Sequence, residues 1–126
     1  MRSERIVELG TASVTVVETP LFLRKAAKIL DEEARIALVQ AVAEEPEAGE
    51  IIPETGGVRK LRWALPGKGK SGGARIIYYF HSDRMPAVLL SIYAKNAKVN
   101  LNQAERNGLK RLIPELVEEY RKGKRT

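Results

Sequence analysis

The sequence predicts an α+β fold: one small, twisted, antiparallel-rich sheet with an N-terminal pair of helices packed on it and a C-terminal helix. Two adjacent segments with helical apolar spacing follow a short β-branched run. Three runs of strand composition come next, and a long helical segment follows them. With 126 residues, 44% of them hydrophobic, we expect a single domain over 1–126, with flexible ends at 1–12 and 121–126.

The first third of the chain is expected to form a strand and two helices. Residues 13–18 are rich in β-branched side chains, which favour a strand. Thr19 and the proline after it are typical of a helix start, so we expect a helix over 20–30. Asp31 would cap a second helix, and the short connection predicts an antiparallel helical hairpin. Residues 51–57 contain proline and glycine and are expected to form turns.

The rest of the chain is expected to form a strand meander and a helix. Strands are predicted over 58–64, 74–80 and 87–93, and a helix over 101–120. Pro114 lies inside that helix and removes a backbone donor, so we expect a kink or break just before it. The expected order of elements is β-α-α-β-β-β-α.

Charge is distributed unevenly along the chain. Residues 1–54 have a net charge of −5, whereas residues 55–104 have a net charge of +8. Cations held on a sheet form a surface suited to a polyanion, which points to RNA or DNA. The stretch between Thr55 and Asp83 holds six cationic side chains and no acidic one: Arg59, Lys60, Arg62, Lys68, Lys70 and Arg75.

Composition excludes several classes of function. The chain has no cysteine, which excludes disulfides and thiolate metal sites, and its only histidine is His81. No run approaches the roughly 20 apolar residues of a membrane span. The first residues carry charges where a signal peptide needs an apolar stretch. We therefore expect a cytoplasmic protein without membrane contact.

Three cations are expected to form the core of a functional site. Lys60 and Arg62 are two residues apart on a strand and share one face, and Arg75 would approach them across the hairpin. The alternative is a solvated strand face, or a sheet edge that charge protects from aggregation. Lys95 and Lys98 follow the next strand and would join the cluster if that strand is a neighbour. Otherwise they belong to an ordinary polar loop.

Glycine-rich and aromatic positions allow two interpretations each. The loop with Lys68 and Lys70 lacks the spacing of a phosphate-binding P-loop, so we interpret it as a cationic arm that contacts RNA. Strand aromatics are more often core residues than base-stacking platforms. Tyr93 is the exception that we assign to the site, because it ends a strand beside Lys95. His81, at a strand end, is expected to be structural.

Segments 56–63, 73–79 and 93–96 contain the elements R-K-x-R-W, G-A-R-I-I-Y-Y and Y-A-K-N in this order. Together they resemble the HigB branch of the RelE-type toxins of bacterial type II toxin–antitoxin systems, from about Val14 to the last helix. The resemblance implies a RelE-like fold and an endoribonuclease that enters the ribosomal A site and cuts the mRNA codon there. It also implies a cognate helix-turn-helix antitoxin similar to HigA.

The resemblance also implies residue roles. In the RelE branch a strand pair of lysines, two arginines and a C-terminal tyrosine matter. The lysine pair aligns with Lys60 and Arg62, the first arginine with Arg75 and the second with about Asn96. The tyrosine position falls near Asn102, which leaves proton transfer to other groups. The catalytic candidates are therefore Lys60, Arg62, Arg75, Lys95 and Tyr93.

Cleavage of RNA by its own 2′-hydroxyl needs a base, positive charge at the phosphorus and an acid at the leaving oxygen. A lysine packed among cations has its charged form disfavoured and becomes a usable base, while arginine stabilises the phosphate. No metal or other cofactor is needed, because positive side chains replace it. A non-catalytic nucleic-acid-binding module and a protein-binding domain that works through its acidic helices are the alternatives. The RNA-contact candidates are Arg59, Lys68, Lys70 and Lys98.

Overall fold

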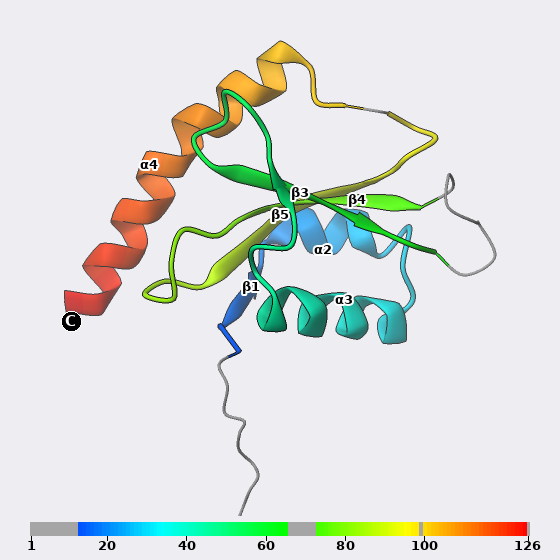
Figure 1. The fold of residues 1–126 in the computed structure, drawn as a ribbon, viewed down its shortest axis with the longest axis horizontal. Helices are drawn as coiled ribbons and strands as arrows, with labels where there is room; N and C mark the ends of the chain where they lie inside the picture. The colour runs from blue at the N-terminus through cyan, green and yellow to red at the C-terminus, as the bar shows by residue number, and fades with distance from the viewer. Residues whose placement is uncertain (1–12, 66–72, 99, 126) are drawn as a thin grey trace, which may run out of the picture.

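A five-stranded mixed sheet lies between two layers of helices, with α2 and α3 on one face and α4 on the other (Figure 1). This confirms the predicted α+β fold class. The computed structural model of the protein describes residues 13–65, 73–98 and 100–125. Residues 123–125 are described by their backbone only. In chain order the elements are β1 (Val16–Glu18), α2 (Pro20–Ala26), α3 (Glu32–Glu44), β2 (Glu50–Ile51), β3 (Val58–Trp63), β4 (Ala74–Tyr79), β5 (Ala87–Ala94) and α4 (Gln103–Arg125).

The strand order is β1-β5-β4-β3-β2. The meander β3-β4-β5 is antiparallel as predicted, and β1 pairs with β5 in parallel. Residues 51–57 were expected to form only turns, and this is wrong for Ile51. Glu50 pairs with Lys60 and Ile51 pairs with Arg59, which makes the edge strand β2. A strand of two residues is too short to show any alternation in the sequence.

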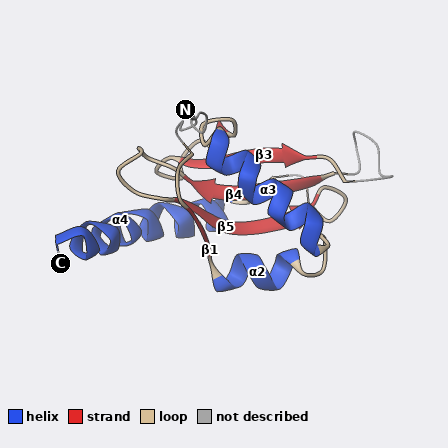
Figure 2. Cartoon of the chain, turned by 90° about the horizontal axis from the view of Figure 1, so that it is seen from below, coloured by secondary structure: helices blue, strands red, loops and turns tan. Residues whose placement is uncertain are grey.

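Side-chain caps begin both N-terminal helices, as the sequence predicts. Thr19 Oγ1 accepts a hydrogen bond from Phe22 N at 3.2 Å and donates one to Leu89 O at 2.8 Å, which fixes α2 to the sheet. Asp31 Oδ1 accepts from Ala34 N at 2.8 Å at the start of α3. The helix α2 ends at Ala26, earlier than expected, and turns lead to α3. Figure 2 shows both helices on the same face of the sheet.

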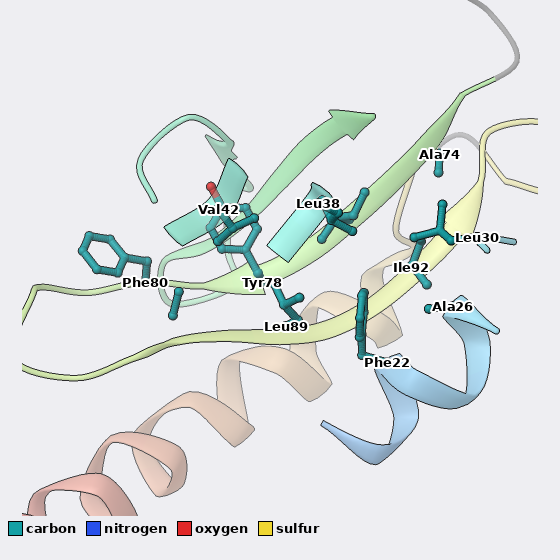
Figure 3. Packing of buried hydrophobic residues seen from close by; sticks show 12 residues of the cluster. Phe22, Ala26, Leu30, Leu38, Val42, Ala74, Tyr78, Phe80, Leu89 and Ile92 are labelled. Carbon is teal, nitrogen blue, oxygen red and sulfur yellow. The ribbon is translucent and has the colours of Figure 1, made fainter. Parts of the chain in front are cut away.

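One hydrophobic core fills the space between the sheet and α2 and α3 (Figure 3). Phe22 and Leu38 are fully buried there against Tyr78 and Leu89. The Tyr78 hydroxyl accepts from Gly49 N and donates to Pro46 O, both at 2.8 Å, so the buried phenol has its hydrogen bonds satisfied. These two bonds hold the segment before β2 against the sheet.

A second core lies under α4. Ile113, which is 4% exposed, packs with Ile77 and Tyr79 of β4 and Val88 of β5. The helix passes through Pro114 without a break, contrary to one of the outcomes expected there. It also continues to Arg125, so the expected flexible end at 121–126 is helical over most of its length. The expected flexible end at 1–12 lies outside the described residues.

Candidate active site

Strand β3 sends its side chains alternately to the two cores. Leu61 and Trp63 pack against the core under α2 and α3, whereas Val58 belongs to the core under α4. Because side chains alternate along a strand, Lys60 and Arg62 lie on the α4 side. The predicted common face of these two cations is therefore present.

The next two strands extend this row of polar groups. Arg62 pairs directly with Arg75 of β4, and Arg75 pairs with Tyr93 of β5. The Arg75 side chain is largely buried, at 7% exposure, and its Nη1 donates to Ala74 O at 3.1 Å. Two guanidinium groups thus lie on neighbouring strands, as the sequence predicts for the hairpin.

An open hollow of about 490 Å³ lies over these cations, beyond the part of the sheet that α4 covers. Lys95 reaches it because its backbone N–H donates to Gly73 O at 2.9 Å, which fixes the end of β5 beside the start of β4. We call this hollow the cationic hollow. Its lining residues are Ala48, Glu50, Lys60, Leu61, Arg62, Arg75, Lys95 and Asn100.

The cations of the hollow form no ion pair within the part of the chain that the structure describes, although Glu50 also lines the hollow. Lys60 Nζ donates to Asn100 Oδ1 at 3.0 Å, and no ion pair involves Lys60, Arg62, Arg75 or Lys95 there. Like charges on neighbouring strands repel each other unless an anion lies between them. The hollow therefore carries an excess of positive charge, because four cations and one carboxylate line it.

Tyr93 and Lys98 form a separate group beside the hollow. Lys98 Nζ lies 5.7 Å from the centre of the Tyr93 ring and forms an ion pair with Glu105. Burial raises the pKa of the Tyr93 phenol, Arg75 opposes this rise and Glu105 adds to it. The hydrogen bonds from Lys98 and from Asn102 N hold the pKa of Glu105 below its usual range. Neither Tyr93 nor Lys98 lines the hollow.

The family model described as the RelE toxin of the RelE / RelB toxin–antitoxin system matches residues 16–123. The chain belongs to the RelE toxin family. This agrees with the resemblance of the sequence to the RelE-type toxins, while the narrower HigB branch stays a prediction.

Two solved structures are similar to this RelE-family chain. An arginine double mutant of the E. coli toxin RelE in the free state has a TM-score of 0.50 at 18% identity, covering 69% of this chain and 88% of its own. The solution structure of the conserved hypothetical protein HP0894 from Helicobacter pylori has a TM-score of 0.29 at 15% identity, covering 66% and 96%. The first similarity supports the RelE-like fold.

The other RNA-contact candidates have different surroundings. Arg59 lies on the face opposite to Lys60, and its Nη1 donates to Glu47 O at 3.1 Å and Gly49 O at 2.8 Å. Its position therefore fits the bracing of β2 rather than RNA contact. Lys98 is ion-paired, as described above. Lys68 and Lys70 lie outside the described residues.

The remaining aromatic side chains are structural in position. Tyr78 and Tyr79 are buried in the two cores, Trp63 packs at the margin of the first, and the exposed His81 stacks on Tyr79 with ring centres 6.5 Å apart. This fits the interpretation of strand aromatics and His81 as structural. Tyr93 is also buried, at 9% exposure.

Sequence reasoning missed three residues near the cations of this RelE-family chain. Glu50 lies opposite Lys60 across the β2–β3 pair. A carboxylate therefore lies beside the cations of the hollow, although the stretch of sequence between Thr55 and Asp83 has no acidic residue. Asn100 binds Lys60, and Arg106 lies in a smaller hollow beside it. No local pattern marks these positions, because a two-residue strand, a loop and a helix bring them together.

The described residues contain neither a cluster that could hold a metal nor a membrane-spanning helix. Among the described residues no group of three or more histidine, cysteine, aspartate or glutamate side chains is arranged to hold a metal ion. Within the same ranges no helix has the length and apolar character to cross a bilayer.

Proposed function

We propose that this chain is the toxin of a type II toxin–antitoxin pair, and that it cleaves the mRNA codon in the ribosomal A site. Its membership in the RelE family supports the toxin assignment. The cationic hollow supports the nuclease activity, because it offers positive charge where the phosphate of a bound nucleotide would lie.

The cross-strand pair of Arg62 and Arg75 is the observation that carries the proposal. Arginine stays charged and can bind two phosphoryl oxygens at once. Two such groups on adjacent strands, with no ion-pair partner among the described residues, suit a phosphorane whose negative charge grows during the reaction. The rigid sheet fixes their spacing before the substrate arrives.

The reaction would proceed without a metal ion. Lys60 acts as the base that takes the proton from the 2′-hydroxyl, and the 2′-oxygen forms a bond to phosphorus. The bond from phosphorus to the 5′-oxygen breaks, and Lys95 donates a proton to that oxygen. The products are a 2′,3′-cyclic phosphate and a free 5′-hydroxyl. Lys95 suits the acid role better than Tyr93, because only Lys95 lines the hollow.

The ribosome would supply what so small an enzyme lacks. A splayed mRNA codon in the A site is already oriented, so the partner contributes much of the positioning that lowers the barrier. The net charge of +6 favours docking among rRNA phosphates. The proposal includes a cytoplasmic location and a helix-turn-helix antitoxin similar to HigA, as the HigB-like elements of the sequence imply.

The test combines Lys60→Ala with Arg75→Ala in an inducible gene. We expect the double variant to lose growth arrest and mRNA cleavage while keeping the far-UV circular dichroism of the folded chain. Arg111→Ala is the matched control, because Arg111 is exposed on α4 and does not line the hollow. Full toxicity of the folded double variant would contradict the proposal. Retained RNA binding without any cleavage by the wild type would favour the non-catalytic module instead.

A further inference from the structure

The Lys60 side chain is tied to a distant segment of the chain by one hydrogen bond. Its Nζ donates to Asn100 Oδ1 at 3.0 Å, and the two residues are 40 positions apart in the sequence. Both line the cationic hollow, where Lys60 is half-buried and Asn100 is exposed. Because a lysine stem is flexible, a contact at its end decides where the amino group lies.

The backbone around Asn100 is fixed on both sides, although its side chain is exposed. Asn102 Oδ1 accepts from Glu105 N at 2.8 Å, and Glu105 Oε1 accepts from Asn102 N at 2.9 Å, so the two residues cap the start of α4 reciprocally. Lys98, on the other side of Asn100, forms an ion pair with Glu105. Leu101 packs against the core under α4. The Asn100 amide therefore extends from a backbone that tertiary contacts hold in place.

A second acceptor is available to Lys60 and is not used. Glu50 lies directly opposite Lys60 across the β2–β3 pair and lines the same hollow, yet the two form no ion pair in the part of the chain that the structure describes. An ion pair with Glu50 would offset the positive charge that faces a phosphate. The carboxamide oxygen of Asn100 binds the amino group without adding negative charge to the hollow.

We propose that Asn100 is a positioning residue for Lys60, an inference that rests on the proposed function. Asn100 does not touch the reacting atoms. It binds one N–H of Lys60 and so holds Nζ in the hollow that Arg62 and Arg75 also line, with the rest of the amino group free to face the 2′-hydroxyl. A catalytic group that is already oriented loses little entropy when the substrate arrives.

The first experiment replaces Asn100 by two side chains that differ in the acceptor. Asn100→Leu keeps a similar size and removes the acceptor, whereas Asn100→Gln keeps a neutral carboxamide on a stem one methylene longer. In single-turnover cleavage of A-site mRNA, we expect Asn100→Leu to lower the maximal rate by about 10- to 10²-fold, the cost of a misplaced catalytic group. The half-saturating toxin concentration should stay the same, and Asn100→Gln should recover most of the rate.

The second experiment measures the position of Lys60 without ribosomes. Carbon-13 relaxation at Lys60 Cε in the full chain reports how strongly the end of the side chain is ordered. We expect the order parameter to fall in Asn100→Leu and to return toward the wild-type value in Asn100→Gln. Asn107→Leu, at an exposed position of α4 that does not line the hollow, is the matched control and should change neither the order nor the rate. Asn100→Ala replaces Asn100→Leu if circular dichroism shows that the latter does not fold.

The two measurements separate this inference from the proposed function. An unchanged order of Lys60 in the variant without the acceptor would overturn the positioning role, and so would a full cleavage rate of that variant. A lost rate that Asn100→Gln does not recover would also overturn it. A loss of order that Asn100→Gln restores would support the positioning of Lys60, even if the wild type cleaves no mRNA and the proposed function fails.

Discussion

The two faces of the central sheet differ although the same strands build them. The face under α2 and α3 is closed by a continuous apolar core that includes Phe22, Leu38 and Tyr78. The opposite face is apolar only where α4 covers it, and beyond that helix it presents Lys60 and Arg62 to an open hollow. Since side chains alternate along a strand, one six-residue strand serves stability with one set of residues and chemistry with the other.

The difference between the faces predicts which substitutions affect stability and which affect only activity. On the open face, Lys95→Gln is expected to lower the rate of mRNA cleavage by about 10²- to 10⁴-fold, the usual contribution of a general acid. Chemical denaturation should show little change, because Lys95 keeps its backbone bond to Gly73. The measurement is single-turnover cleavage of A-site mRNA in a purified translation system.

A matched control for this prediction is Lys98→Gln, a lysine of the same loop that does not line the cationic hollow. We expect it to cleave much faster than Lys95→Gln. Equal losses in the two variants would mean that general charge, and not an acid at position 95, accounts for the effect.

On the closed face, Phe22→Ala is expected to destabilise the fold by about 3–5 kcal/mol, because it leaves a cavity in a fully buried site. Urea denaturation monitored by circular dichroism gives the change in the free energy of unfolding. Leu21→Ala, at an exposed position of the same helix, is the control and should cost much less. Similar losses at both positions would show that the core is not closed as described.

A smaller effect is expected at the buried phenol of the closed face. Tyr78→Phe removes the hydroxyl that bonds the buried Gly49 N and the half-buried Pro46 O and leaves both backbone groups without this partner, at a cost of about 1–3 kcal/mol. Denaturation of the variant measures this loss, and its cleavage rate should stay close to that of the wild type. A loss of cleavage without a loss of stability would contradict the separation of the two faces.

The smallest effect is expected at Glu105, beside the open face. The lowered pKa of Glu105 means that its carboxylate stabilises the fold above the usual pKa of about 4.3, and that this contribution is lost as pH falls through the lowered value. The side chain is 37% exposed, so solvent screening keeps the contribution below about 1 kcal/mol. Denaturation from pH 7 to acid should show Glu105→Gln less stable only at the higher pH. A difference in stability between the variant and the wild type that stays constant with pH would show that the charge of Glu105 is not the cause.

The sequence allowed the meander and the shared face of Lys60 and Arg62 to be predicted, because both follow from alternation within one strand. It did not reveal β2, which is too short for a pattern, or the helical tail to Arg125. Asn100 and Arg106 also escaped prediction, since only tertiary packing brings them to Lys60. Local periodicity thus predicted the part of the site that lies on one strand. The contacts between distant segments could be found only in the folded structure.

The comparison of Arg59→Ala with Arg62→Ala tests the account most directly, because these residues belong to one strand and point to opposite faces. The measurement is cleavage of ribosome-bound mRNA per folded molecule, with the free energy of unfolding beside it. Arg62→Ala should lower cleavage by about 10²- to 10³-fold with unchanged stability. Arg59→Ala should lose stability, because its bonds to Glu47 O and Gly49 O disappear, while the folded fraction keeps its cleavage. Normal cleavage by Arg62→Ala, or its loss in folded Arg59→Ala, would contradict the account.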